Sequence, residues 1–329
     1  MQSAGELAEI SSLKREISRT QVIIFAGGQG KRLGVNLPKA LVQLNGETLI
    51  ERCVNFFSRA GFSDFVFVLR HGHEKVYQHL KEVSPYGIKA SFSVDRRGME
   101  AGRENGRAKA LKYAIEMGHI DLTKRCIVTY PDDIFTDETL PRRVLAEHLQ
   151  VVSSLQAQGS LVLTAGMKWP YGAAEVDRLG LVRNFTEKPF IPQPTSVGNY
   201  VLEPEVYDLV SDCVEMDRDG PLELEQTVIP RLSLMGKLYG IFIPDNCWIP
   251  INTQKDLEEA EKVLAGLRPL MTNVIIKKEL AIAAHTTVST YVEKVKDTTP
   301  VLVKEIDASM EAERGLLKLA GRYNPEFEL

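Results

Sequence analysis

Apolar runs and amphipathic segments alternate along the first half of the chain. Short runs rich in β-branched and aromatic residues predict strands at residues 22–25, 65–72, 90–94 and 126–133. Between the strands, apolar residues recur at helical spacing and predict helices at residues 47–61, 74–83 and 106–118. This alternation predicts an α/β fold with a mostly parallel, Rossmann-like sheet flanked by helices, which binds ligands at the carboxyl ends of its strands.

In the second half of the chain, strands and helices alternate less regularly. It predicts a helix at 140–155, a strand at 160–167, a hairpin over 171–189 that turns at 177–180, a strand that runs into a helix over 196–210, and a hairpin-like pair before a final helix over 236–264.

We expect three parts. Residues 1–20 form a helical extension with apolar positions at Leu7, Ile10, Leu13 and Ile17, and residues 21–266 form the main domain. Residues 267–329 form a small, mainly helical extension with helices near 280–295 and 310–319. We assign this last part a structural role, with oligomerisation as the leading alternative.

Composition narrows the function. The 329 residues carry a net charge of −4, whereas nucleic-acid-binding domains are usually basic. The sequence contains no run of about 18 apolar residues that would cross a membrane. Its N-terminus lacks the apolar core of a signal peptide, and its four cysteines are scattered without metal-ligand or disulfide-framework spacing. We therefore expect a cytoplasmic protein that binds neither nucleic acid nor membrane.

A glycine-rich loop follows the first predicted strand, in the sequence VIIFAGGQGKRLGVNLPKA. Gly27, Gly28 and Gly30 allow main-chain N–H groups to approach a phosphate without a Cβ in the way. Arg32 and Lys39 add positive charge, and we expect a helix after the loop to present its positive end to the same anion.

Two common phosphate loops do not fit this segment. The P-loop requires Ser or Thr after Gly30-Lys31, where this chain has Arg32. The dinucleotide-binding motif requires a third glycine at Leu33 and an acidic residue at the end of the next strand, where Arg70 stands.

The pattern G-G-x-G-x-R-L…P-K-x-L does fit, and it resembles the signature of the sugar-1-phosphate nucleotidylyltransferases. The resemblance spans roughly residues 21–265. It implies that a sugar-1-phosphate oxygen attacks the α-phosphorus of an NTP, which gives a nucleotide sugar and pyrophosphate. The attacking group is already an anion, so such catalysis requires alignment and charge neutralisation rather than a general base.

The resemblance assigns catalytic roles to Arg32, Lys39, Asp132 and Lys188. Asp132 and Asp133 follow an apolar strand, and adjacent carboxylates repel each other unless a cation or hydrogen bonds offset the repulsion. The pair therefore favours Mg²⁺ ligation. The resemblance implies that Asp132 is the ligand, because the family has Gly-Asp after this strand and Pro131-Asp132 stands there in this chain.

Further residues follow from the same resemblance. Nucleotide binding is implied for Ala26, Gly27, Gly28, Gly30 and Gly106. Sugar-phosphate binding is implied for Gly172, Glu187, Lys188 and Asn199, with Glu187-Lys188 standing in a Glu-Lys-Pro motif. The segment ELEQTVIP, residues 223–230, also resembles the family, but we expect it to serve packing.

Two segments depart from the family pattern. The late Trp-x-Asp motif has Pro250 in place of its metal-binding aspartate, which leaves Asn252, Asp133 or Asp245 as the second metal ligand. Residues 106–110 read GRAKA instead of a Gly-Thr-x-Gly-Ala-like run, so the nucleobase stays open, as does the sugar.

The leading prediction is a Mg²⁺-dependent enzyme that acts on an NTP and a sugar-1-phosphate, assembled as a homo-oligomer. One alternative is a cytidylyltransferase for phosphocholine or an inositol phosphate. The other is a non-catalytic homologue that binds a nucleotide sugar and regulates a partner.

Overall fold

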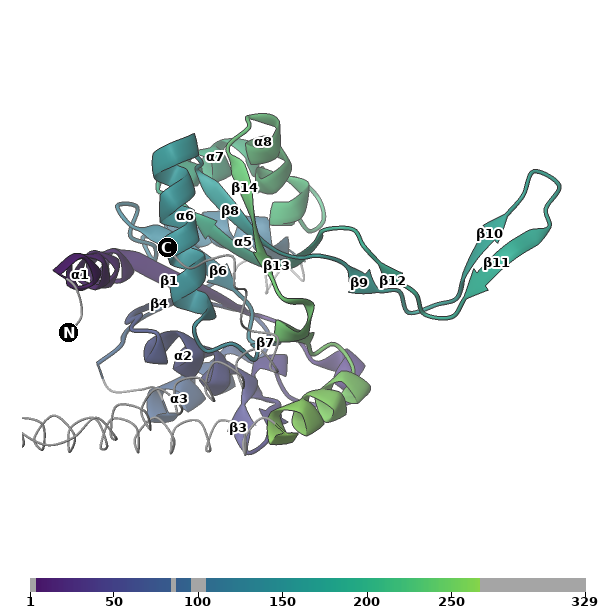
Figure 1. Cartoon of the computed structure of the whole chain (residues 1–329). Coiled ribbons are helices and arrows are strands. Elements are labelled where there is room, and N and C mark those ends of the chain that lie inside the picture. The colour runs from purple at the N-terminus through teal and green to yellow at the C-terminus, as the bar shows by residue number, and fades with distance from the viewer. Residues whose placement is uncertain (1–3, 84–86, 96–104, 267–329) are drawn as a thin grey trace, which may run out of the picture. The chain divides into compact units, whose positions relative to one another are not determined.

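A seven-stranded sheet forms the centre of the computed structural model, which describes residues 4–83, 87–95 and 105–266 (Figure 1). The strand order is β14-β8-β13-β6-β1-β4-β5. Strand β13 runs antiparallel to both of its neighbours, and every other neighbouring pair is parallel. The predicted α/β fold with a mostly parallel sheet is confirmed.

The elements have the following bounds. The α-helices are α1 (Ala4–Ser18), α2 (Leu49–Arg59), α3 (His73–Val83), α5 (Gly106–Glu116), α6 (Leu140–Leu155), α7 (Glu205–Cys213) and α8 (Val228–Leu234), and residues 254–266 are also helical. The 3-10 helices are η1 (Lys31–Leu33), η2 (Lys39–Leu41), η3 (Leu224–Gln226) and η4 (Asp245–Cys247). The strands are β1 (Thr20–Ala26), β2 (Gln43–Leu44), β3 (Glu47–Thr48), β4 (Asp64–Leu69), β5 (Lys89–Val94), β6 (Arg125–Thr129), β7 (Asp133–Phe135), β8 (Gly159–Thr164), β9 (Met167–Lys168), β10 (Ala173–Val176), β11 (Val182–Thr186), β12 (Phe190–Ile191), β13 (Thr195–Leu202), β14 (Leu238–Ile243) and β15 (Trp248–Pro250).

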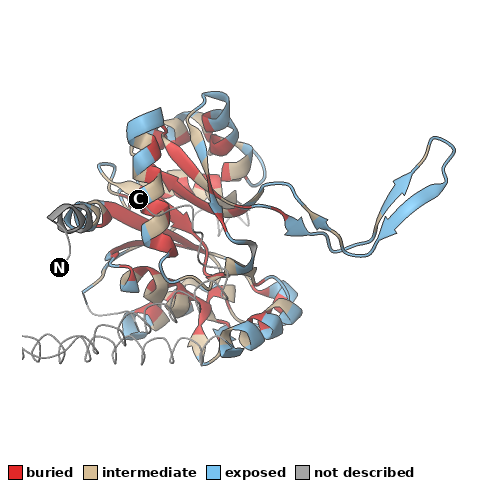
Figure 2. Ribbon diagram, in the orientation of Figure 1, coloured by how far each residue is buried: buried red, intermediate tan, exposed pale blue. Residues whose placement is uncertain are grey.

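The central strands are buried on both faces, as expected for parallel strands covered by helices (Figure 2). Along β1, Val22 and Ile24 join one hydrophobic cluster, whereas Ile23 and Phe25 join the other. Helices α1, α2, α3 and α6 contribute to the first cluster, and α5, α7 and α8 contribute to the second. The sheet therefore separates two cores.

The N-terminal helix packs on the main sheet. Ile17 is buried in the first cluster, and the carboxylate of Glu16 lies 2.7 Å from Arg125 Nη1. The Arg125 Nε atom also donates to Glu203, 2.6 Å away, and the Nε2 atom of His148 lies 2.9 Å from the same carboxylate oxygen of Glu203. This partly buried network joins α1 and α6 to the ends of β6 and β13.

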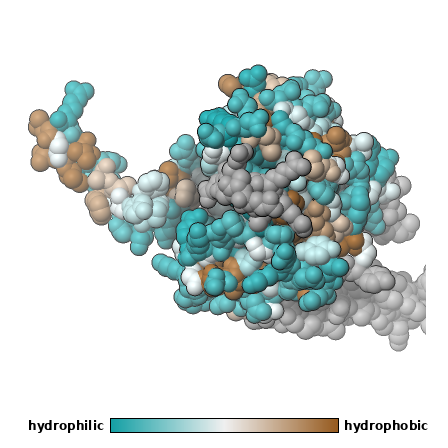
Figure 3. Space-filling model, turned by 180° about the vertical axis from the view of Figure 1, so that it is seen from behind, coloured by the Kyte–Doolittle hydropathy of each residue, from teal (hydrophilic) through white to brown (hydrophobic). Residues whose placement is uncertain are grey.

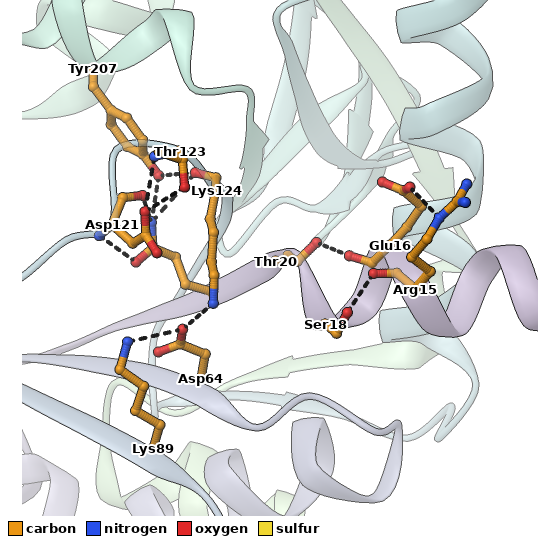
Figure 4. Close-up of polar contacts among 11 residues, drawn as sticks. Arg15, Glu16, Ser18, Thr20, Asp64, Lys89, Asp121, Thr123, Lys124 and Tyr207 are labelled. Carbon is orange, nitrogen blue, oxygen red and sulfur yellow. Dashed lines mark hydrogen bonds and ion pairs between the residues drawn. The ribbon is translucent and has the colours of Figure 1, made fainter.

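Polar contacts also join the amino ends of the parallel strands (Figure 4). Asp64, at the start of β4, accepts a hydrogen bond from Lys124 Nζ at 2.7 Å and lies 3.6 Å from Lys89 Nζ at the start of β5. The hydroxyl of Tyr207 donates to the main-chain oxygen of Lys124 at 2.9 Å. These contacts stabilise the amino ends of the strands, on the side of the sheet opposite their carboxyl ends.

Three local predictions were wrong. Residues 236–264 do not form a hairpin, because β14 pairs with β8 in the main sheet and β15 pairs with β7. The strand expected at 126–133 divides into β6 and β7, since the chain turns where Asp133 N donates to Tyr130 O at 3.3 Å. The glycine loop runs into the short 3-10 helices η1 and η2, and the first α-helix among the described residues after it is α2.

Residues 167–191, which contain β9 to β12, form a two-stranded arm that projects from the sheet (Figure 1). The predicted hairpin over 171–189 is present as the antiparallel pair β10 and β11. Hydrophobic side chains gather towards the end of the arm (Figure 3). The arm joins β8 to β13, so it begins and ends in the main sheet.

The predictions about the two ends of the chain fall only partly within the described residues. The helices expected near 280–295 and 310–319 lie outside the described residues, as do the side chains of Leu7 and Ile10. Among the described helices, none is both long enough and apolar enough to cross a membrane.

Candidate active site

A cavity of about 460 Å³ opens at the carboxyl ends of β1, β4, β5 and β6. This is the edge at which an open α/β sheet usually binds its ligand. Residues from the glycine loop, from α5 and from the end of β6 meet there, together with one residue from the segment before η3. The residues that line the cavity include Ala26, Gly27, Gly28, Arg32, Lys39, Ser93, Gly106, Arg107, Tyr130, Asp132 and Glu223.

The glycine loop forms one wall of the cavity. Ala26, Gly27 and Gly28 line it, and the carbonyl oxygen of Gly28 accepts a hydrogen bond from Lys39 N at 3.0 Å. Gly30 does not line the cavity but turns the loop, because it adopts a left-handed conformation with φ of 70°. The loop that the sequence singled out therefore lines the cavity, and 3-10 turns stand where an α-helix was expected behind it.

Two predicted cations and one predicted metal ligand line the same cavity. Lys39 Nζ forms an ion pair with Asp132 Oδ2, and Asn252 Oδ1 lies 3.5 Å from the same ammonium nitrogen. Arg32 is exposed and also lines the cavity. The arrangement places positive charge and oxygen donors where an anionic ligand could be bound on glycine backbone.

The structure does not place an oxygen of either remaining candidate for the second metal ligand, Asp133 or Asp245, in the cavity. Asp133 accepts a hydrogen bond from Trp248 Nε1 at 2.9 Å and does not line the cavity. Burial and the neighbouring Asp132 carboxylate raise the pKa of Asp133 to about 8. The side chain of Asp245 lies outside the described part of the chain.

The donor set fits a magnesium ion that relies on its substrate for ligands. Among the described residues, no group of three or more His, Cys, Asp or Glu side chains could hold a metal. Mg²⁺ is commonly bound by one or two protein oxygens together with phosphates and water. Asp132 and Asn252 supply such a pair, since an oxygen of each contacts the Lys39 ammonium group.

At its other end the cavity is shaped by the first turn of α5. Gly106 has φ of 70°, and a Cβ atom there would lie 2.5 Å from Leu222 N and still closer to Leu222 O. Leu222 O accepts from Ala108 N at 2.9 Å, and Leu222 N donates to Asn105 O at 3.0 Å. Only glycine can therefore join α5 to the segment around Leu222 this closely.

An arginine held by two carboxylates closes this end. Arg107 Nε donates to Glu223 at 2.6 Å, and Nη2 donates to Glu225 at 3.2 Å. The guanidinium also lies 5.0 Å from the ring centre of Tyr130, a distance typical of a cation–π contact. The Tyr130 hydroxyl and the buried Ser93 hydroxyl have no hydrogen-bond partner among the described residues.

The parts that Arg107 and Glu223 play in forming the cavity were not predicted from the sequence. Arg107 stood out there only as a departure from the family pattern, and residues 223–230 were expected to serve packing. Packing is part of their role, because Leu224 and Val228 are buried in the second cluster. The signal for the rest is an unusual arginine next to Gly106 in the sequence, but its carboxylate partner lies 116 positions away.

The predicted sugar-binding residues do not join the cavity. Gly172, Glu187 and Lys188 lie on the exposed arm, where Lys188 Nζ is 3.8 Å from Glu187 Oε1. Asn199 is buried in β13, and its Nδ2 atom donates to Thr129 Oγ1 at 2.7 Å. The structure thus brings Arg32, Lys39, Asp132 and Asn252 together and leaves the predicted sugar residues elsewhere.

Comparisons with known proteins agree with this architecture. The sequence profile of the nucleotidyl transferase family matches residues 21–265. A mannose-1-phosphate guanyltransferase of Debaryomyces hansenii is 27% identical over 240 residues, which are 71% of this chain and 61% of that protein. The catalytic subunit beta of mannose-1-phosphate guanylyltransferase from Drosophila melanogaster is 23% identical over 245 residues, 72% of this chain and 60% of that one.

The chain thus spans about three fifths of the length of these two relatives. In structure, it is similar to a protein of Bacillus anthracis that is described as a glucose-1-phosphate thymidylyltransferase and was solved with sucrose. The TM-score is 0.55 at 19% identity, over 74% of this chain and 94% of the other. The resemblance found in the sequence motifs is confirmed, and the chain belongs to the nucleotidyl transferase family, in which its relatives include sugar-1-phosphate nucleotidylyltransferases.

Proposed function

We propose that this protein transfers a nucleoside monophosphate from an NTP to a sugar-1-phosphate and releases pyrophosphate. The observation that carries the proposal is that the glycine loop, Arg32, Lys39 and Asp132 line the same cavity. Family membership supports the reaction class. We also propose that residues 21–266 form the catalytic domain, flanked by the extensions at 1–20 and 267–329.

The chain's own groups would act mainly by alignment and charge neutralisation. Main-chain N–H groups around Gly27 and Gly28 would hold phosphate oxygens, and the exposed Arg32 would reach the outer phosphates with its bidentate guanidinium. Lys39 would neutralise charge nearer the reacting phosphorus. A sugar-phosphate oxygen then bonds to the α-phosphorus, and the bond to the bridging oxygen breaks with its electron pair leaving on pyrophosphate.

We propose that Asp132 and Asn252 hold a Mg²⁺ ion together with substrate oxygens. Bound there, Mg²⁺ would supply positive charge to the phosphate oxygens. Asp132 would help hold the metal with the carboxylate that pairs with Lys39 in this structure, and the Lys39 ammonium group would contact the phosphates.

The test is pyrophosphate release measured with four NTPs and a panel of sugar-1-phosphates in the presence of Mg²⁺. Guanylyl transfer to mannose-1-phosphate is the first combination to test, because that activity is in the names of the relatives. Asp132→Ala should lower turnover by at least about 100-fold while the protein stays folded. Asp212→Ala, which removes an exposed carboxylate on α7, should leave turnover unchanged. Full activity of the Asp132 variant would refute the metal site.

We also propose that Glu187 and Lys188 bind the sugar phosphate. This role can be tested separately from the roles of the residues that line the cavity. Lys188→Ala should raise KM for the sugar phosphate by about tenfold and leave KM for the NTP nearly unchanged, because one charge-assisted contact to a phosphate is lost. Lys168→Ala is the matched control on the same arm. A selective loss of NTP affinity in the Lys188 variant would contradict this role.

A second candidate function is nucleotide-sugar binding without catalysis. It is favoured by one feature, the neutral amide of Asn252 where a carboxylate would bind Mg²⁺ more strongly. Ligand binding without turnover on every substrate pair would support it. Turnover with phosphocholine or an inositol phosphate, but with no sugar phosphate, would instead support the other acceptor class. A cytoplasmic location and a homo-oligomeric state stay proposals alongside the main one.

A further inference from the structure

The end of the cavity formed by α5 carries more negative than positive charge. Arg107 lies between the carboxylates of Glu223 and Glu225, so the three side chains sum to one negative formal charge. Their exposed fractions are between 29% and 37%, which leaves the group only partly hydrated. Glu223 lines the cavity, whereas Glu225 does not. Because a carboxylate repels phosphate, this end is suited to a ligand group that donates hydrogen bonds.

The carboxylate of Glu223 is held through one oxygen and leaves the other for a ligand. Its Oε2 atom accepts hydrogen bonds from Arg107 N at 3.1 Å and from Arg107 Nε at 2.6 Å. Its Oε1 atom has no hydrogen-bond partner among the described residues. A hydrogen bond in a partly dehydrated site is stronger than the same bond in water. Glu223 therefore brings to the cavity an acceptor whose position is fixed before a ligand arrives.

The segment that carries Glu223 is attached to α5 by several contacts. The buried side chain of Lys109 donates through Nζ to the main-chain oxygens of Arg218 and Gly220, the second at 3.1 Å. Leu222 adds its two main-chain hydrogen bonds to the start of α5. A binding group supported in this way loses little conformational freedom when it meets its ligand. The contacts thus distinguish Glu223 from a flexible surface carboxylate.

The pair formed by Arg107 and Glu223 lies on one particular side of the glycine loop. Its guanidinium lies over the ring of Tyr130, which follows β6, and a Cβ atom on Gly198 of β13 would lie 3.3 Å from the same ring. In the sheet, β6 and β13 lie on one side of β1, and β4 and β5 lie on the other. The pair therefore belongs to the side on which the arm leaves the sheet.

The opposite side of the cavity suits a nucleoside. Val68 and Leu69 at the end of β4 line it, together with Ala110 and Tyr113 of α5. Apolar and aromatic side chains are the usual lining of a pocket that holds a flat organic ring. With the phosphates on the glycine loop and the nucleoside on the β4 side, the β6 side is left for the acceptor sugar.

We propose that Glu223 determines which acceptor is used, by accepting a hydrogen bond from one sugar hydroxyl through Oε1, and that Arg107 is the residue that positions it. The inference rests on the proposed function, because it requires a sugar-1-phosphate as acceptor. It also defines the acceptor class. A sugar with a hydroxyl or amino group at this end is bound, and one with a carboxylate there is rejected by the negative charge.

The first experiment removes one sugar hydroxyl at a time. The ratio kcat/KM is measured for the best acceptor of the wild type and for analogues that each lack one hydroxyl. With wild-type protein, the analogue without the hydroxyl that contacts Glu223 should lose about 10- to 100-fold, because a hydrogen bond to a charged group is lost. In Glu223→Gln the contact is weaker already, so that analogue should lose less than about fivefold. KM for the NTP should stay within about twofold. A variant with the wild-type pattern of losses overturns the proposal.

Glu225→Gln is the matched control, because it removes the other carboxylate from Arg107 without changing the lining of the cavity. It should affect all acceptors by the same factor and keep the wild-type pattern of losses. If it changes the pattern as Glu223→Gln does, the effect belongs to the charge of the whole group and the proposal is overturned.

Arg107→Lys tests the positioning role and serves as the second variant if thermal unfolding shows that Glu223→Gln is not folded. It keeps the positive charge but loses the guanidinium nitrogen that holds Oε2. It should reduce the loss for the same analogue, and it should add little to Glu223→Gln in the double variant. A wild-type pattern, or fully additive losses in the double variant, contradicts the positioning role.

The second experiment measures binding and needs no turnover. Calorimetry compares GDP-mannose with GDP, UDP-glucose with UDP and dTDP-glucose with dTDP, so that each difference isolates the sugar. For the pair that binds most tightly, Glu223→Gln should weaken the nucleotide sugar by about tenfold and the free diphosphate by less than about twofold.

An equal loss for both ligands overturns the proposal, since Glu223 would then contact the nucleoside or the phosphates. A wild type that binds none of these nucleotide sugars overturns it too. If the wild type binds a nucleotide sugar but turns over no substrate pair, the proposed catalytic function fails, and the calorimetric comparison still decides whether Glu223 contacts the sugar.

Discussion

The substitution Gly106→Ala probes how closely the first turn of α5 must approach the segment around Leu222. Two costs add. Alanine at φ of 70° adopts a left-handed conformation, which costs about 1–2 kcal/mol. Its Cβ atom would also lie 2.5 Å from Leu222 N, so the two segments must separate by about 1 Å to restore an ordinary contact.

That separation weakens the two main-chain hydrogen bonds that Leu222 makes to Ala108 and Asn105. Each is worth about 0.5–1.5 kcal/mol net. The expected loss is therefore about 2–4 kcal/mol in the free energy of unfolding, which corresponds to a fall in Tm of about 5–15 °C for a domain of this size. Because Gly106 and Arg107 line the cavity, KM for the nucleotide should rise as well.

Gly118 provides the matched control at the other end of the same helix. It has φ of 71°, and a Cβ atom there would meet no described atom within 4 Å. Gly118→Ala should therefore show only the conformational cost of about 1–2 kcal/mol and an unchanged KM. Urea unfolding and steady-state kinetics of both variants measure the difference. If the Gly106 variant is no less stable than the Gly118 variant, the close contact with Leu222 does not constrain the site.

Two further predictions concern charge. Asn252→Asp should lower the Mg²⁺ concentration for half-maximal turnover by about tenfold, since it adds a negative charge beside Asp132, and an unchanged requirement would contradict ligation at position 252. Glu203→Gln should cost roughly 2–3 kcal/mol at neutral pH, because it breaks a buried pair while Arg125 keeps its contact with Glu16. Burial opposes ionisation of Glu203, but hydrogen bonds from His148 and Arg125 prevail and lower its pKa. The stabilisation is thus present at neutral pH and is lost as pH falls below the usual glutamate pKa of about 4.3. Urea unfolding should show the two proteins converging there, and a deficit that persists in acid would count against the ionic network.

The order of strands and helices could be predicted because burial leaves a local signature. Helix α6 spans the residues that its apolar spacing predicted, and β1 is apolar from its third residue to its end. The end of the cavity formed by the glycine loop was also predictable, because the loop and Lys39 lie in one short stretch of sequence, residues 27–39.

Long-range pairing left no such local signal. Strands β14 and β15 follow one another like the two halves of a hairpin, yet each pairs with a strand far earlier in the chain. Arg107 and Glu223 find each other only after folding. Alternation also predicted the hairpin over 171–189 but not that both of its faces would be exposed, because the pattern says which residues are apolar and not what covers them.

The points at which the arm leaves and rejoins the sheet bear on how this protein can change. Thr164 and Thr195 are register partners across β8 and β13, so the arm is an insertion between two residues that already face each other. A short turn could replace it without moving any strand of the sheet. Evolution or protein engineering can therefore lengthen, exchange or delete this arm while the folding unit stays intact.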